Sequence, residues 1–391
     1  MKLILKLLLL FSIVKFEFLF FNYLSFIYKP RRVIEARVIA QYKKRDYYVL
    51  KLKNREVTFY TTTYEDLKNL INDKLRLKIF TKNLSFLGYL TSFYAPSYDI
   101  KLLPLSKVDK FIEIQHKERK ISNLFRALFL GESMDYQTRL ALSSLGIAHL
   151  FALSGLHLGI ISFLVFFIVR LFYSFFHKYF PYRNLYFDVG LIVLGVEFLY
   201  LYFTNFPPSL IRAYLLEVIL FFMFFTLRDV LRFRVLGLLL GVSFLFFTFS
   251  VFTLGFLLSF LGVFYIYLFF NYFKPNFKNS ILLSFYLFVV MSVYSFYFFH
   301  KSSDFIFLAP FITLLFPFFY VVEVVLHLLN MGGSLDFLVK GVLSLGKVRE
   351  VDVSLVEVLV FLFLSLMAIK KKWAFYGINV IGLIFVLRSF L

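Results

Sequence analysis

Residues 146–161 read GIAHLFALSGLHLGII, and this stretch decides the class of fold. It places His149, Ser154 and His157, together with glycines, inside sequence that is otherwise as apolar as lipid. Polar side chains and helix-loosening glycines are tolerated at membrane depth mainly where they pack inside a helix bundle or line a polar path. The stretch therefore predicts the interior of a membrane-embedded bundle.

The composition points the same way. Of the 391 residues, 61% are hydrophobic and 22% are aromatic, and apolar runs recur near the roughly 20 residues that a helix needs to cross about 30 Å of hydrocarbon. We expect a polytopic α-helical membrane protein. Its apolar spans are expected at residues 3–28, 147–176, 185–204, 209–227, 235–253, 255–270, 281–299, 306–329, 353–369 and 373–391. The absence of cysteine excludes a disulfide framework and a thiolate metal site.

A basic, polar stretch follows the first span. The formal net charge of +20 must lie outside the hydrocarbon, facing anionic lipid headgroups or a polyanionic ligand. Residues 29–118 hold 19 Lys and Arg against 10 Asp and Glu, more than membrane anchoring requires. Strand-like alternation is expected at residues 32–40, 47–53, 56–61 and 75–80, with Asn54 and Arg55 at a hairpin turn. This pattern predicts a small β-barrel, of which an OB-like barrel is one form, or alternatively a β-sandwich.

The chain therefore divides into five parts. We expect a retained transmembrane anchor (1–28), because no small-residue cleavage site follows it, and a basic β-rich, OB-like domain (29–118) inserted after that anchor. An amphipathic surface segment (119–145), a helical core (146–330) and C-terminal helices (331–391) follow. Within the last part, residues 331–345 fit either a surface helix or a re-entrant one.

Charges in the loops predict the orientation. The connections at residues 177–184, 228–234 and 271–280 hold seven Lys or Arg, whereas the alternating connections hold only Lys301. By the positive-inside rule the first set is cytoplasmic. Counting back places the β-rich domain outside and the N-terminus inside, although the basic residues at 29–32 favour the opposite arrangement.

Three polar motifs carry the candidate chemistry. In the first, Ser154 and His157 are expected on one face of a helix with His149 near them. They fit a catalytic Ser and His pair, a two-histidine metal site, or a hydrogen-bonded helix crossing. The crossing is favoured, since no carboxylate stands nearby in the sequence to orient His157 and two ligands do not make a metal site.

The second motif is TNFPPSLIRAYLLE, residues 204–217. Its two prolines predict a tight turn, and Ser209 is expected to cap the helix that follows. Arg212 then lies about one turn inside that helix, where its guanidinium either snorkels to the interface or contacts a phosphate.

The third motif is LGFLLSFLGVF, residues 254–264. Its Gly255, Ser259 and Gly262 share a face of small residues, which favours close helix packing. The stretch GVLSLGKV at residues 341–348 lacks the Ser or Thr of a phosphate-binding loop, so we expect no nucleotide and no other cofactor.

The three motifs, in this order, resemble those of the ComEC competence-channel family, and the resemblance covers about residues 130–320. It implies a non-enzymatic channel in the bacterial inner membrane that passes single-stranded DNA into the cytoplasm during natural transformation. The family's motif residues fall on His149, Ser154, Gly155, His157, Gly159, Ser209, Arg212, Ala213, Gly255, Phe256, Leu258, Ser259 and Phe260. Leu257 and Thr313 depart from the usual Gln and Asn.

The partners that the resemblance implies are single-stranded DNA, membrane lipids, a DNA receptor, a nuclease, and a cytoplasmic motor or helicase. The sequence contains no metallo-β-lactamase-like domain, so strand degradation is expected from another protein, and no metal site is expected here.

The basic domain is compatible with this function, because a single strand needs cations for its phosphates and aromatic faces for its bases. The expected DNA-binding residues are Arg37, Lys43, Lys44, Arg45, Tyr47, Tyr48, Lys51, Lys53 and Arg55, with Tyr42, Phe59 and Tyr60 as further aromatic surfaces. Two alternatives remain, an intramembrane hydrolase that uses Ser154 and His157, and a lipid or polysaccharide transporter.

Overall fold

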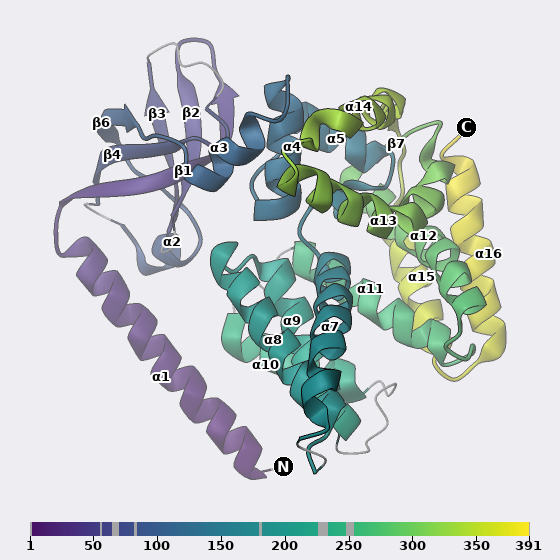
Figure 1. Cartoon of the computed structure of the whole chain (residues 1–391). Helices are drawn as coiled ribbons and strands as arrows, with labels where there is room; N and C mark the ends of the chain where they lie inside the picture. Colours follow the sequence, from purple (N-terminus) through teal and green to yellow (C-terminus); the bar gives the residue numbers. More distant parts are fainter. Residues whose placement is uncertain are drawn as a thin grey trace. The chain divides into compact units, whose positions relative to one another are not determined.

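The computed structural model describes residues 2–54, 57–64, 70–81, 84–179, 182–225, 234–247 and 254–390, with side chains from residue 14 onward except for 234 and 244–247. The described chain forms two compact units (Figure 1). The first is built mainly from the residues up to Ile114 together with Glu132–Asp135. The second is built mainly from Gln115–Gly131 and the chain from Tyr136 onward. Each unit is described by itself.

The first unit contains a six-stranded mixed sheet. Its elements are α1 (Lys2–Ile27), β1 (Arg31–Lys43), β2 (Tyr48–Lys53), β3 (Thr58–Thr63), β4 (Lys74–Phe80), α2 (Phe86–Leu90), β5 (Phe93–Tyr94), β6 (Ser97–Leu102) and α3 (Lys107–Glu113). The strand order is β5-β3-β2-β1-β4-β6, with β3 and β5 parallel and the other neighbours antiparallel. The four expected strands are therefore present, with small differences at their ends.

The expected closed barrel is wrong in this structure, because the ladder ends at β5 and β6. These two edge strands follow one another in the chain, separated only by Ala95 and Pro96. No ladder joins them within the described residues, although the Thr61 hydroxyl on β3 lies 2.6 Å from that of Ser97 at the start of β6. The sequence analysis missed β5 because two residues are too few to show a strand period, and it also missed β6, although the residues of β6 alternate between polar and apolar.

Alternation along the strands builds the core of this unit. Leu50 and Leu52 on β2 and Leu75 and Leu77 on β4 are almost fully buried, since successive side chains of a strand point to opposite faces. Phe26, near the end of α1, is 1% exposed in the same core. The last turns of α1 therefore pack on the sheet.

The second unit is helical. Its elements are α4 (Arg119–Leu130), α5 (Tyr136–Ser144), α6 (Ala148–Phe151), α7 (Gly155–His177), α8 (Leu185–Phe203), α9 (Pro208–Phe225), α10 (Arg234–Phe247), α11 (Leu254–Phe270), α12 (Phe277–Phe299), β7 (Lys301–Ser302), η2 (Ile306–Leu308), α13 (Ala309–Leu328), η3 (Gly332–Leu335), α14 (Asp336–Leu345), β8 (Arg349–Glu350), α15 (Leu355–Met367) and α16 (Lys372–Arg388). Its two short strands pair antiparallel.

Five helical segments of the described chain are long and apolar enough to cross a membrane, which makes this a multi-pass membrane protein. They are Gly155–His177, Leu185–Phe203, Pro208–Phe225, Phe277–Phe299 and Ile306–Leu328. The anchor expected at residues 3–28 is not among them, and the side chains of residues 1–13 lie outside the described part. The span expected at 235–253 is described only to Phe247. Segment 331–345 forms η3 and the ten-residue α14, too short to cross.

The helices of this unit pack in two groups. Helices α7, α8 and α9 contact one another, and α12 packs against α11, α15 and α16 (Figure 1). A buried hydroxyl chain stabilises the second group: the Tyr265 oxygen lies 2.8 Å from that of Tyr294 and 2.7 Å from that of Ser365. Such bonds join α11, α12 and α15 where no water is present to replace them.

Candidate functional site

The chain breaks just before α7, and this break sets the geometry of the first motif. The span expected at residues 147–176 is divided into α6 and α7, with Ala152, Leu153 and Ser154 between them in extended or irregular backbone. Ser154 is the N-cap residue of α7, so it does not share a helix with His149, and that prediction was wrong. The helical pattern is interrupted just before Gly155, where Ser154 has extended backbone.

Ser154 and His157 nevertheless meet. The backbone N–H of Ser154 donates to Nδ1 of His157 over 3.3 Å, and the Ser154 hydroxyl lies 3.1 Å from the same nitrogen. The His157 ring is fully buried, with the rings of Phe316 and Tyr320 edge-on to it at centroid distances of 5.4 and 5.0 Å. Within the described chain its Nε2 has no hydrogen-bond partner. The contact is a reciprocal cap at the helix start, which satisfies groups that a helix otherwise leaves open.

The second motif packs directly on the first. The Ser209 hydroxyl donates to the carbonyl oxygen of Leu153 over 2.6 Å, so it holds the α6–α7 break instead of capping its own helix, which begins at Pro208. A Cβ on Gly155 would lie 3.3 Å from the Cβ of Ala213, so α7 and α9 approach closely at this glycine.

The turn before α9 fixes this placement. Asn205 and Phe206 both have positive φ, at 59° and 52°, immediately before Pro207 and Pro208. Phenylalanine rarely adopts this conformation, so the surrounding contacts must hold it there. The strained turn therefore orients the first residues of α9.

Arg212 connects the second motif to the third. Its guanidinium donates to the carbonyl oxygen of Gly255 over 3.1 Å and lies 5.1 Å from the ring centroid of Phe256. The residue is only 8% exposed, and its Nε has no hydrogen-bond partner in the described part of the chain. No carboxylate forms an ion pair with it among those residues.

The small face of the third motif is open instead of packed. A Cβ built on Gly255 or Gly262 meets no atom within 4 Å among the described residues, and the same holds for Gly159 on α7. The expected close helix packing at Gly255, Ser259 and Gly262 is therefore not present in the described structure. By contrast, a Cβ on Gly382 of α16 would lie 2.9 Å from the backbone oxygen of Val289, as a packed glycine does.

The other ionisable side chains of these helices form contacts that do not include Arg212. Ser162 on α7 lies between two glutamates, with its hydroxyl 2.7 Å from Glu217 on α9 and in contact with Glu197 on α8. Asp188 accepts two hydrogen bonds from Arg183, at 2.7 and 2.8 Å. Glu217 therefore does not neutralise the Arg212 guanidinium.

In the first unit, cations and tyrosines gather on the β1–β2 hairpin and the strand beside it. Lys43, Lys44, Arg45 and Tyr47 are exposed at the hairpin end. On the outward face, Nζ of Lys51 lies 5.2 Å from the Tyr60 ring centroid, and Tyr60 pairs with Tyr94 on β5. The exposed outward row from the hairpin end to Tyr60 and Tyr94 is therefore basic at the hairpin end and aromatic at the other end.

Several expected residues of the basic domain have other positions. Phe59 is fully buried in the core and offers no surface for stacking. Arg37 forms ion pairs with Asp109, at 3.2 Å, and with Glu132, so its charge is already neutralised, although burial lowers its pKa. Lys53 and Tyr42 are exposed, Tyr48 is half-buried with Lys43 Nζ 5.8 Å from its ring centroid, and Arg55 lies outside the described residues.

The sequence reasoning missed Tyr94 and Tyr64, which are 57% and 80% exposed. The Tyr64 ring lies 6.1 Å from that of Tyr47, and the Tyr94 hydroxyl lies 2.9 Å from that of Thr62. The positions of these two tyrosines depend on pairing between strands that are distant in the sequence. In the sequence itself, only the spacing of the tyrosines indicates these positions.

The described residues contain no group of three or more His, Cys, Asp or Glu that could hold a metal ion. Among the residues that the structure describes, no carboxylate forms a hydrogen bond with His157, whose Nδ1 accepts the Ser154 backbone N–H. The Ser154 and His157 pair therefore has the geometry of a helix cap and lacks the third group of a hydrolytic triad.

The fold and its three joined motifs define a class, the polytopic membrane proteins with an N-terminal β-sheet unit. A family model described as "Competence protein" matches residues 128–389, and the chain belongs to this family, of the ComEC type. The match includes all three motifs and extends beyond the region of the resemblance to the C-terminal helices. Membership implies a role in DNA uptake during transformation. Searches among curated proteins and among solved structures found no match.

Proposed function

We propose that this protein is the inner-membrane channel component that passes single-stranded DNA into the cytoplasm during natural transformation. The observation that carries the proposal is the contact of Arg212 with Gly255 and Phe256, which connects the second and third motifs. A guanidinium within a membrane span is unfavourable by at least about 2.5 to 3.5 kcal/mol on insertion scales. It persists where it has a partner or a function, and the described chain supplies a carbonyl oxygen and an aromatic ring but no carboxylate.

A transiting phosphate fits this guanidinium. Arginine binds phosphate through planar, charge-assisted hydrogen bonds, and a site without a resident carboxylate keeps donors free for a mobile anion. The open faces of Gly255 and Gly159 leave space beside the backbone of α11 and α7. In this proposal Ser154, Gly155, His157 and Ser209 fix the backbone of the path, while His149 and Ser259 line it.

The basic unit would receive the strand before it reaches the membrane. Lys43, Lys44, Arg45 and Lys51 supply cations, and Tyr47, Tyr60 and Tyr94 supply stacking surfaces, the combination that sequence-tolerant single-strand binders use on OB-type sheets. The proposal places this unit outside the cytoplasm and the N-terminus inside, as the loop charges predict. The protein itself acts without catalysis, and a receptor, a nuclease and a motor or helicase act as separate partners.

Loss of the protein separates this proposal from a lipid or polysaccharide transporter. A strain without the chain should grow normally and take up no DNA into the cytoplasm, whereas defects in growth or in the cell envelope together with normal transformation would contradict it. A photoreactive residue at Gly255 should crosslink to incoming labelled DNA. The same residue at Leu199, which is 55% exposed on α8, is the matched control and should not crosslink.

A further inference from the structure

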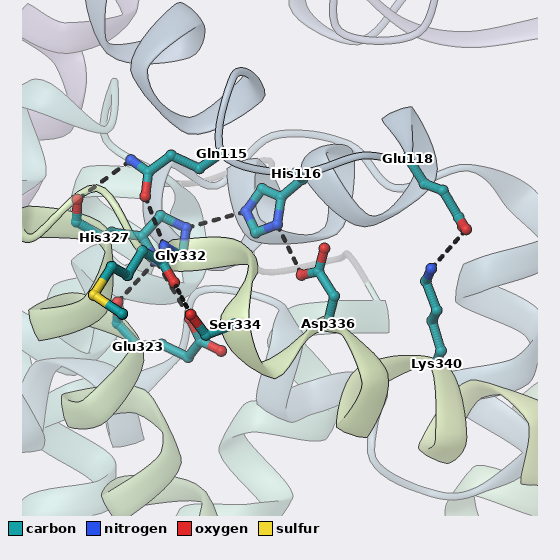
Figure 2. A network of polar contacts seen from close by, with 10 residues as sticks. Gln115, His116, Glu118, Glu323, His327, Gly332, Ser334, Asp336 and Lys340 are labelled. Carbon is teal, nitrogen blue, oxygen red and sulfur yellow. Dashed lines mark hydrogen bonds and ion pairs between the residues drawn. The ribbon is translucent and has the colours of Figure 1, made fainter.

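A second polar cluster lies in the helical unit, apart from the three motifs (Figure 2). His116, in the segment before α4, has its Nδ1 2.8 Å from a carboxylate oxygen of Asp336, the first residue of α14. Its Nε2 lies 3.1 Å from Nε2 of His327, near the end of α13. Nδ1 of His327 lies 2.8 Å from the backbone oxygen of Glu323 and 3.3 Å from its carboxylate. The four groups thus form one linear series of polar contacts, Asp336–His116–His327–Glu323.

These four side chains are almost completely buried. The side chains of His116 and Glu323 are 0% exposed, that of His327 is 6% exposed, and that of Asp336 is 13% exposed. The ring of Phe125 stacks on His116 at 4.5 Å, and Phe129 lies edge-on to His327. Only the Asp336 end approaches the surface.

Hydrogen-bond chemistry fixes the number of protons. A backbone carbonyl only accepts, so Nδ1 of His327 must carry a proton. The contact between the two Nε2 atoms needs one more proton, since two lone pairs would otherwise face each other. The contact between His116 Nδ1 and the Asp336 carboxylate needs a third. Two neutral imidazoles carry only two such protons, and ionised carboxylates carry none. This geometry therefore requires one additional proton.

We propose that Asp336, His116, His327 and Glu323 form a buried proton-binding relay, in which one extra proton moves along the chain between the two carboxylates. In one state His116 is the imidazolium beside Asp336. Transfer of the proton from His116 Nε2 to His327 Nε2 makes His327 the imidazolium beside Glu323. The proton count and the total charge of the four groups are the same in both states, so no other reactant is needed.

The surroundings favour this pairing. Neither carboxylate oxygen of Glu323 has a hydrogen-bond partner in the described chain, so a neighbouring imidazolium is its available counter-charge. Other charged groups on the packed elements are Glu118 and Lys340, which pair with each other at 2.7 Å, and Arg126 on α4, which is almost fully buried. Burial lowers the pKa of the His116 imidazole below its ordinary value of about 6.5, and the neighbouring Asp336 carboxylate opposes this shift.

Backbone contacts hold the relay in place. Gln115 donates to the backbone oxygen of His327 over 3.3 Å and accepts the Gly332 N–H over 2.8 Å. A Cβ on Gly332 would lie 2.6 Å from Nε2 of His327, so any larger residue there displaces the ring. Protonation of the relay is thereby linked to the packing of the α4 segment on α13, independently of DNA transport.

The test is ¹⁵N NMR of the full chain in lipid nanodiscs, labelled at its six histidines. At pH 5 the signals removed by His116→Gln and by His327→Gln should show three protonated ring nitrogens and a coupling between the two Nε2 atoms. As the pH rises to 8, the number of protonated ring nitrogens should fall from three to two and the coupling should disappear in the same titration. Two neutral rings at pH 5 without the coupling, or two independent titrations, would overturn the proposal.

Two further variants keep the test decisive. Gly332→Ala keeps every titratable group and should abolish the coupling, whereas His300→Gln, which changes a half-exposed histidine, should leave it intact. Tightly retained zinc, measured by metal analysis after incubation with zinc and dialysis, would identify a metal site and would also overturn the relay.

Discussion

The guanidinium of Arg212 on α9 donates a hydrogen bond to the carbonyl oxygen of Gly255, 3.1 Å away on α11. Gly255 belongs to the first turn of its helix, and the same arginine covers the ring of the next residue, Phe256. One side chain thus joins two motifs that are 43 residues apart. Through Ser209, the same helix also holds the break of the first motif.

The space beside Gly255 gives the first prediction. Gly255→Leu should place its side chain in the open region next to Arg212 and reduce the DNA that reaches the cytoplasm at least tenfold. Because a Cβ at this position meets no described atom within 4 Å, the thermal midpoint of the purified protein should stay the same. A transport assay and a thermal unfolding scan check both parts.

Gly382→Leu is the matched control for that variant. Its Cβ would meet the Val289 backbone at 2.9 Å, so this change should lower the thermal midpoint and the amount of folded protein. Normal transport by Gly255→Leu protein would show that the open face is not part of the DNA path.

The hydroxyl chain on α11 gives a second prediction, concerning stability. Ser365 donates to the backbone oxygen of Phe361 over 2.8 Å, so Tyr265 must donate to Ser365 and accept from Tyr294. Tyr265→Phe leaves the buried Tyr294 hydroxyl without its acceptor, which should destabilise the fold by about 1–3 kcal/mol. Thermal unfolding in detergent measures it, with the exposed Tyr376→Phe as the control that should change nothing.

How far the sequence predicts this structure depends on the range of the contacts. Strand alternation over residues 47–53 and 75–80 and the long apolar runs are local patterns. The corresponding strands are present, and five of the expected apolar runs form helices of the described chain that are long enough to cross a membrane. The division of the span at 147–176 was not predicted, because Leu153 keeps the run apolar while the break is held by Ser209, 56 residues away.

The candidate site shows the same division. Its motif residues were recognisable from the sequence, but their contacts were not. Ser209 was expected to cap its own helix and instead donates to Leu153. Phe59 was expected to offer a stacking surface, but strand alternation places its side chain in the core. Tyr94 lies in the outward row only because β5 pairs with β3 at Tyr60.

The hairpin cations give a third prediction. Each phosphate contact of a single strand contributes about 0.7 to the slope of log affinity against log salt concentration. Replacing Lys43, Lys44 and Arg45 with serine should therefore weaken binding of single-stranded DNA by the purified full chain and reduce that slope by about 2 units. Fluorescence anisotropy at several salt concentrations measures it.

Two lysines on the neighbouring strands β4 and β6 serve as the control for this experiment. Lys78 and Lys101 both pair with Asp99, and the hydrogen bond that Lys78 donates to the Asp99 carboxylate raises the pKa of Lys78. Their replacement with serine should change the slope by less than about 1 unit, because Asp99 already compensates one of their two charges. Equal effects of the two sets would mean that binding is not localised at the hairpin.

A fourth prediction concerns strand degradation. The purified protein should show no metal-dependent nuclease activity, because hydrolytic metals need a cluster of ligands and the described residues contain none. Incubation of labelled DNA with magnesium, manganese or zinc checks this. Cleavage that survives repurification and stops on addition of a chelator would contradict it.

The central claim is that Arg212 contacts the transported strand, and the most direct measurement is the arrival of labelled DNA in the cytoplasm of cells that carry Arg212 variants at normal protein level. With Arg212→Ala we expect DNA to bind outside the cell as before and its arrival in the cytoplasm to fall below detection. Arg212→Lys should retain part of it, because the charge remains while the planar donors are lost. Normal transformation by Arg212→Ala cells would contradict the account, since the guanidinium would then have only a packing role.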